Sequence, residues 1–136
     1  MAESLSVNIG AELHVAHAYR AGPAATVFGF DLQEYEQELA IIKREHLDAL
    51  VGNHTINPST THLLHQLVAE IIPQYADRDC IDVIVMGTVS RGGIPGLLIG
   101  NTAEGILDRV SCDVLLIKPT GFITPIELIK NSREKS

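Results

Sequence analysis

The sequence has little cysteine and no long apolar run. Cys80 and Cys112 are the only cysteines, and they do not stand in C-x-x-C spacing. Two isolated cysteines are typical of buried thiols in a reducing compartment, so we expect a cytoplasmic protein. No apolar run approaches the roughly 18 residues of a membrane span, which predicts no membrane association. No basic segment followed by an apolar stretch opens the chain, so no secretory signal is expected.

Basic residues are also scarce. The chain has 10 lysines and arginines against 17 acidic residues, and its formal net charge is −7. The basic residues are scattered, whereas binding to a nucleic-acid backbone needs lysines and arginines in clusters. The charge pattern therefore predicts no nucleic-acid partner.

Apolar residues are plentiful, since they make up 46% of the 136 residues. This fraction is enough for the core of one domain of usual size. We expect a single domain over residues 1–122. The C-terminal tail, residues 123–136, is polar at its end and is expected to fray.

Hydrophobic periodicity predicts that helices and strands alternate. Gly10 is placed to cap a preceding helix, and Asp31 with Glu34 resembles a capping box that begins another. The segments 81–87 and 113–119 are apolar on both faces, as is typical of parallel strands covered by helices on both sides. The alternation predicts an α/β fold with a mainly parallel open sheet. Helices are expected at 2–8, 31–52, 68–79 and 101–110, and strands at 12–19, 61–66, 81–87 and 113–119.

A glycine-rich stretch, VMGTVSRGGIPGLLIGNTAEG at 85–105, joins a predicted strand to a predicted helix. In open α/β sheets ligands bind at the carboxyl ends of strands, and helix starts favour anions. Three known motifs do not match: the stretch lacks the Lys-Ser/Thr of a Walker A loop and any G-x-G-x-x-G. Thr88 stands where a nucleophile elbow around Ser90 needs glycine. A tight connection that binds nothing is the alternative.

Residues 81–119, IDVIVMGTVSRGGIPGLLIGNTAEGILDRVSCDVLLIKP, resemble the C-terminal signature of the universal stress proteins. The GNTAE segment, and CDVLLIKP followed by TPIEL, are most similar to the second domain of the tandem, universal stress protein E subclass. The segment GAELHVAHAY resembles the second strand of the family. The resemblance implies a three-layer, Rossmann-like fold with a parallel sheet in the order 3-2-1-4-5.

The resemblance also implies a nucleotide site, with ATP as the candidate ligand. ATP-binding members carry G-x2-G-x9-G-(S/T) after the fourth strand. Its three glycine positions fall here on Gly87, Ser90 and Gly100, and Asn101 takes the Ser/Thr position. A side chain at Ser90 costs about 1–2 kcal/mol if positive φ is needed there, which weakens binding by about tenfold. The candidate nucleotide-binding residues are Ala18, Met86, Gly87, Ser90, Arg91, Gly100, Asn101 and Thr102.

By the same resemblance the chain starts within the family's first helix. The first strand, which is central in the family order and carries an Asp of the site, is then expected to be missing. We expect the C-terminal part of a longer tandem protein or a mis-started product. The sheet would close by direct pairing of strands 12–19 and 81–87, by a swapped strand, or by dimerisation.

The last predicted strand carries an apolar edge, and such an edge invites pairing with another copy. We expect a homodimer, or pairing with another universal stress domain, through Val114, Leu115, Leu116 and Ile117. The histidine pairs 14/17 and 62/65 are each three residues apart, so the members of a pair point to opposite faces of a strand. Neither pair can chelate one ion from a single regular strand, and no metal site is predicted.

The leading hypothesis is a stress-response domain that acts by binding and association and not as an enzyme, with a degenerate nucleotide motif. One alternative is an ATP-binding switch with weak ATP hydrolysis. The other is a small serine hydrolase that uses Ser90, which ranks last because the sequence shows no general base beside the loop.

Overall fold

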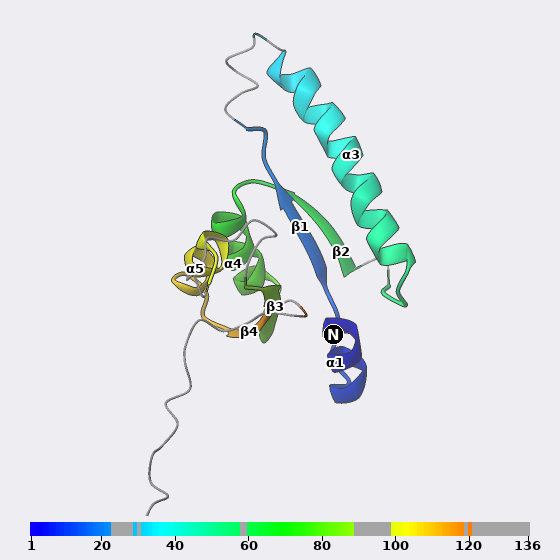
Figure 1. Cartoon of the computed structure of the whole chain (residues 1–136), viewed down its shortest axis with the longest axis vertical. Coiled ribbons are helices and arrows are strands. Elements are labelled where there is room, and N and C mark those ends of the chain that lie inside the picture. The colour runs from blue at the N-terminus through cyan, green and yellow to red at the C-terminus, as the bar shows by residue number, and fades with distance from the viewer. Residues whose placement is uncertain (23–28, 30, 58–59, 89–98, 119, 121–136) are drawn as a thin grey trace, which may run out of the picture.

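The computed structural model of the chain describes residues 1–22, 29, 31–57, 60–88, 99–118 and 120 (Figure 1). Helices and strands alternate along the chain, as predicted, and every strand pair is parallel. The elements are α1 (Ala2–Ile9), β1 (Val15–Tyr19), α3 (Leu32–Gly52), β2 (Thr61–His65), α4 (Val68–Arg78), β3 (Val83–Gly87), α5 (Asn101–Leu107) and β4 (Asp113–Ile117).

Local signals in the sequence set the ends of the first two helices. Gly10 ends α1 in the left-handed conformation, with φ 67°, as its predicted role requires. Asp31 begins α3, and its Oδ1 accepts hydrogen bonds from the backbone N–H groups of Gln33 and Glu34, at 2.9 and 3.3 Å. α3 ends at Gly52, with Asn53 as its cap.

Later elements differ in length from the prediction. α4 begins at Val68 and contains Pro73, so the proline does not mark its start. α5 is only seven residues long and ends at Leu107, three residues early. The strands are trimmed to five residues each, because only these residues have partners in a ladder.

The strands form two separate sheets and not one. β1 pairs with β2 from Val15↔Thr61 to Tyr19↔His65, and β3 pairs with β4 from Val83↔Asp113 to Gly87↔Ile117. In the part of the chain that is described, β1 does not pair with β3. The α/β class with parallel strands is confirmed. Of the three ways in which the sheet was expected to close, direct pairing of β1 with β3 does not occur in this structure. Among the described strands each has one partner, so each of the two sheets has an unpaired edge on both sides.

Within the described residues the buried apolar side chains belong to helices and not to strands. The described strands contain no fully buried residue, and Val83 and Leu115 are 40% and 39% exposed. The expectation that β3 and β4 are covered on both faces is therefore wrong here. The buried apolar residues are Leu47, Val51, Tyr75, Ala76, Ala103 and Ile106.

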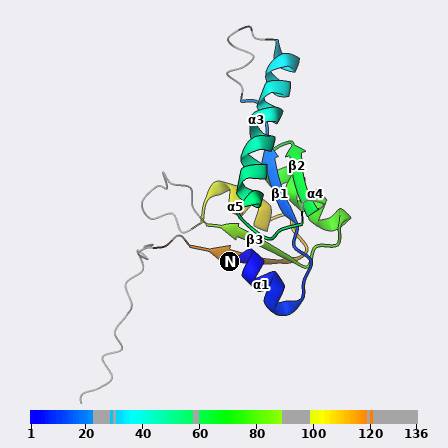
Figure 2. The same cartoon turned by 90° about the vertical axis from the view of Figure 1, so that its right-hand side faces the viewer.

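α4 joins the two halves of the molecule. It packs against β1 and, more extensively, against α5 (Figures 1 and 2). The helices α4 and α5 come so close that a Cβ on Gly105 would lie 2.9 Å from the Cβ of Ala69. Arg109 donates from Nη1 to the carbonyl of Ala69 at 3.3 Å, which strengthens the same contact.

α3 lies along the β1–β2 sheet and contacts β2 (Figure 1). Its buried residues are Leu47 and Val51. The helix expected at 31–52 is confirmed, but its apolar residues Leu32, Tyr35 and Ile42 are exposed. Among the described residues no helix combines the length and apolar character needed to cross a bilayer.

α1 is held to the rest of the chain by polar contacts. The carboxylate of Glu3 accepts hydrogen bonds from the backbone N–H and the hydroxyl of Thr55, at 2.7 and 2.6 Å. It also lies 2.7 Å from Nδ1 of His54. These bonds lower the pKa of Glu3 to about 2, those from Thr55 most strongly. α1 is thus anchored to the segment that follows α3.

Candidate functional site

A cavity of about 850 Å³ lies between the two sheets. The unpaired edges of β1 and β3 border it, and α4 and α5 supply further wall. Six of the eight residues predicted to bind nucleotide line this one cavity. These are Ala18, Met86, Gly87, Gly100, Asn101 and Thr102.

The other two candidates, Ser90 and Arg91, lie outside the described residues. The prediction that Ser90 weakens the motif stays a prediction, as does any contact of Arg91 with a phosphate. The hydrolase alternative depends on Ser90 and stays a prediction too.

Backbone hydrogen bonds bring the two ends of the glycine-rich stretch together. The N–H of Thr88 donates to the carbonyl of Ile117 at 3.1 Å, which continues the β3–β4 ladder by one residue. The N–H of Gly100 donates to the carbonyl of Thr88 at 2.6 Å. The first and third glycine positions of the motif therefore lie beside each other at the carboxyl end of β3, as the predicted loop requires.

Thr88 is a residue of this site that the sequence analysis missed. It lines the cavity and is only 3% exposed, and its Oγ1 is buried with no hydrogen-bond partner within the described ranges. Buried hydroxyl groups normally have a partner, so this oxygen is available to a ligand. The feature of the sequence that could have identified Thr88 is a hydroxyl residue directly after an apolar strand.

The start of α5 is formed by the last glycine of the motif and the residues after it. Gly100 is the capping residue, with ψ 154°, and no side chain caps this helix. Asn101 and Thr102 are instead the first two helical residues, and both are exposed at the cavity. Because α5 has only about two turns, its dipole contributes little. Side chains and backbone at the cavity wall are the groups that would meet a ligand.

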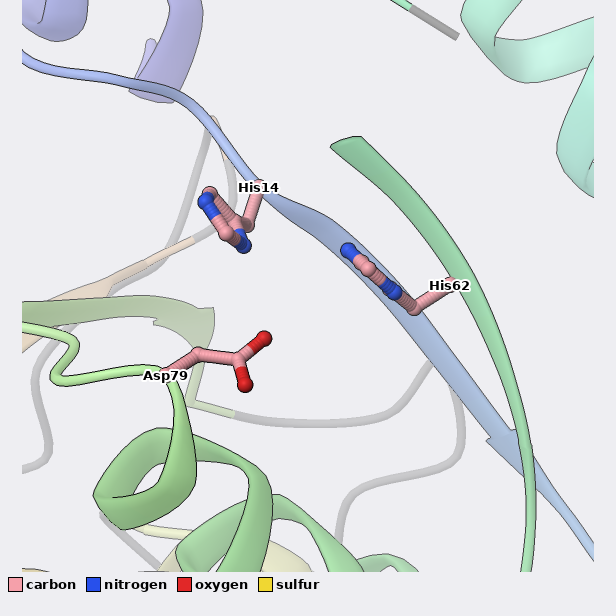
Figure 3. A group of neighbouring side chains, drawn as sticks. All are labelled: His14, His62 and Asp79. Carbon is pink, nitrogen blue, oxygen red and sulfur yellow. The ribbon is translucent and has the colours of Figure 1, made fainter. Parts of the chain in front are cut away.

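A different chemistry lies at the amino end of β1. His14, His62 and Asp79 each place a ligand-type atom within 4.8 Å of the others (Figure 3). Burial lowers the pKa of His62, with the nearby His14 as a second cause. Hydrogen bonds from Arg78 and Tyr75 lower the pKa of Asp79 to about 2. The imidazole of His62 is therefore held neutral and the carboxylate of Asp79 ionised at neutral pH.

Sequence reasoning missed this cluster because it tested histidines within single strands. The members of pairs 14/17 and 62/65 do lie apart, but His14 and His62 come from neighbouring strands. Only the register of β1 on β2 brings them together.

The two cysteines are free thiols in different surroundings. Cys80 is exposed, contrary to the expectation of a buried thiol. Cys112 is partly buried, and burial raises the pKa of its thiol. Neither thiol lines the large cavity.

The predicted dimer edge lies on β4, which pairs only with β3 among the described strands. Leu115 is exposed, and Val114, Leu116 and Ile117 are partly buried. An open, apolar edge is thus present, and its use in a dimer stays a prediction.

Comparisons with known proteins agree with this geometry. The sequence model of the Universal stress protein family matches residues 1–118. Universal stress protein E of Escherichia coli K12 is 36% identical over 122 residues, which cover 86% of this chain and 38% of that protein. The chain thus spans less than two fifths of the length of this relative.

Solved structures show the same fold. A putative universal stress protein from Pseudomonas aeruginosa UCBPP-PA14 matches with a TM-score of 0.63 and 29% identity, over 85% of this chain and 37% of that one. A universal stress protein solved in complex with cAMP matches with a TM-score of 0.54 and 22% identity, over 86% of this chain and 81% of that one. The second likeness supports the fold alone.

Proposed function

The chain belongs to the universal stress protein family, and we propose that it is a stress-response domain that binds an adenine nucleotide between β1 and β3. One observation carries the proposal: six residues that the family motif selects, from β1, β3 and the start of α5, line a single cavity. The volume of about 850 Å³ falls in the range of small-molecule sites. A universal stress protein that shares this fold was solved in complex with cAMP, which is itself an adenine nucleotide.

Each group has a role in this proposal. Ala18 and Met86 form an apolar wall at the carboxyl ends of β1 and β3, suited to the flat face of a base. Gly87 keeps the strand end open for close approach of a ligand. Thr88 offers its unpaired hydroxyl, and Asn101 offers its amide to ribose or phosphate oxygens.

We expect the affinity to be modest. The motif has Ser90 in place of its second glycine, and a side chain there weakens binding by about tenfold if positive φ is needed. We therefore propose binding and association as the mode of action, without turnover. Weak ATP hydrolysis, or ester cleavage that Ser90→Ala abolishes, would favour the enzymatic alternatives.

The test is calorimetric titration of the chain with Mg-ATP and with cAMP. Gly87→Ala is an informative variant, because among the described residues a Cβ there would meet no atom closer than the carbonyl of Ile117, at 4.0 Å. The fold should tolerate the methyl group, while the ligand should not. We expect at least tenfold weaker binding with little change in melting temperature.

Gly22→Ala is the matched control. A Cβ at Gly22 would meet nothing within 4 Å, and the residue does not line the cavity. It should bind like the unsubstituted chain. No heat and no thermal shift at millimolar nucleotide would overturn the proposal, and so would equal affinity in Gly87→Ala.

A second function, association with another universal stress domain or with a second copy, is favoured by the open strand edges. β1 and β3 each have an unpaired edge, and β4 has another on its outer side. Such edges offer free backbone groups to an added strand. Light scattering after size exclusion should give a dimer that Leu115→Lys disrupts, while Ile41→Lys on the exposed face of α3 should not. A clean monomer would contradict pairing of two copies.

A further inference from the structure

Three ligand-type side chains from separate elements meet away from the nucleotide motif. His14 lies just before β1, His62 lies in β2, and Asp79 follows the last residue of α4 (Figure 3). We propose that these residues, called here the His–His–Asp site, bind a divalent transition metal ion of the zinc class. His14 also lines the cavity proposed to bind nucleotide, but none of the candidate nucleotide-binding residues is among the three ligands, so the metal proposal does not rest on nucleotide binding.

The strand register builds the site. Ala16 pairs with His62, so His14, two residues earlier, lies on the same face of the sheet as Ala16 and near His62. The two imidazole rings stack, with centroids 5.5 Å apart and an interplanar angle of 17°. Packing against Tyr75 of α4 fixes both rings, since its ring centroid lies 4.7 Å from that of His62. The ligands are therefore held by three elements before any ion arrives.

The two histidines have ring nitrogens available to a metal. Nε2 of His62 is buried and has no hydrogen-bond partner within the described residues. Nδ1 of His14 is bonded to the hydroxyl of Tyr75 at 2.8 Å, while its Nε2 has only a 3.5 Å contact with the exposed Glu12. Metal-binding histidines usually hold an oxygen on one nitrogen and the ion on the other. In Figure 3 the nitrogen of His14 that faces His62 and Asp79 is Nδ1, next to Cβ, so the Tyr75 hydroxyl would have to leave this nitrogen for the ion to bind.

The carboxylate of Asp79 has a competitor. Arg78 donates from Nε to Oδ1 at 2.6 Å and from Nη2 to Oδ2 at 3.2 Å. The Arg78 side chain is 66% exposed, so it can turn into solvent without disturbing the core. The hydroxyl of Tyr75 is a second hydrogen-bond partner of this carboxylate, and the ion would share the remaining lone pairs of the two oxygens. Metal and guanidinium therefore compete for one negative charge.

The ligand types select the ion. Two imidazoles with one carboxylate suit Zn²⁺, Cu²⁺ or Ni²⁺, whereas Mg²⁺ and Ca²⁺ prefer oxygen alone. In a tetrahedral site with bonds of about 2.0–2.1 Å, ligand atoms lie about 3.3 Å apart. The three atoms, now within 4.8 Å, would have to draw closer. Because all three side chains are only partly buried, small rotations suffice.

The test is titration of the full chain with Zn²⁺ after treatment with a chelator. We expect one ion per chain and a rise in melting temperature, with no effect of Mg²⁺. His62→Gln and His14→Asn should each weaken binding at least tenfold, while circular dichroism shows that they remain folded. His65→Gln is the matched control on the same strand, because His65 lies on the opposite face and contacts Glu36 and Tyr19. It should bind as the unsubstituted chain does.

Two further variants test which side chains hold the ion. Arg78→Gln should tighten Zn²⁺ binding severalfold by removing the competing cation, and unchanged affinity would remove Asp79 from the ligand set. Cys80→Ser should leave binding unchanged, because the thiol is not among the ligands. Loss of binding in Cys80→Ser would overturn the assignment, and so would the absence of any heat or thermal shift in the unsubstituted chain at millimolar Zn²⁺.

Discussion

The two sheets have the same geometry and different chemistry. Each is a parallel pair of five-residue strands. The β1–β2 sheet carries three histidines and a tyrosine, whereas Asp113 is the one ionisable residue of β3–β4. β3 ends in glycine at the nucleotide motif, and the His–His–Asp site lies at the other end of β1. In the two proposals, the metal ligands thus include side chains from one sheet, whereas the nucleotide binds at the open end of a strand in the other.

The helices on the two sheets also differ in how firmly they are held. α3 contributes two buried residues and contacts β2 lightly. α5 is much shorter, yet it buries Ala103 and Ile106 and lies tightly against α4. The length of a helix therefore does not indicate how firmly it packs against the rest of the molecule. We expect the β1–β2 half to open more readily than the α4–α5 contact, and the following predictions test this difference.

Leu47→Ala should have the largest effect. The side chain is 4% exposed, and truncation of a buried leucine costs about 2–5 kcal/mol of unfolding free energy. Since α3 has little else to hold it, amide hydrogen exchange should rise first in α3 and β2. Urea denaturation gives the size of the effect, and exchange gives its location.

Leu50→Ala is the control: at a residue 56% exposed, it should change the free energy of unfolding by less than about 0.5 kcal/mol. Equal loss of protection in β3 and β4 would show that the halves open as one unit.

Gly105→Ala should have an intermediate effect in the other half. The added Cβ would lie 2.9 Å from that of Ala69, so α4 and α5 must separate. Overpacking costs about 1–3 kcal/mol, and the better helix propensity of alanine offsets up to about 1 kcal/mol. A net loss of roughly 1 kcal/mol is expected in thermal unfolding. Gly52→Ala, where a Cβ meets nothing within 4 Å, is the control and should not destabilise the protein. A stabilised Gly105→Ala would contradict a tight α4–α5 contact.

The smallest effect is expected for Glu3, which anchors α1. Its pKa is lowered from 4.5 to about 2, so the ionised form stabilises the folded state. This contribution is complete above pH 4.5 and is lost as pH falls towards about 2. The difference in urea midpoint between the unsubstituted chain and Glu3→Gln should therefore be present at pH 7 and shrink at about pH 3. It should be small because the group is exposed, and a difference that does not vary with pH would show that charge is not the cause.

Features encoded by neighbouring residues were predictable from the sequence. Asp31 and Gly10 set helix ends through their own side chain or backbone, and the alternation of elements gave the α/β class correctly. The spacing between Gly87 and Gly100 selected residues that do line one cavity. In each case the information lies within a short stretch of chain.

Features that depend on distant residues were not predictable. Which face of α3 is buried depends on the elements that cover it, and its apolar residues Leu32 and Ile42 are exposed. The division into two sheets depends on whether a strand lies between β1 and β3. His14 meets His62 only through a strand register, and the role of Thr88 follows from burial. No periodicity in the sequence contains that information.

The short hydrogen bond between Gly100 and Thr88 has a consequence for how this site can vary. Together with the bond from Thr88 to Ile117, it holds the residues on either side of the intervening segment at the end of the sheet through backbone atoms alone. Once the ends of a loop are joined, each doubling of its length costs only about 0.6 kcal/mol. We therefore expect that substitutions or insertions in that segment can change ligand specificity without changing the strand and helix on either side of it.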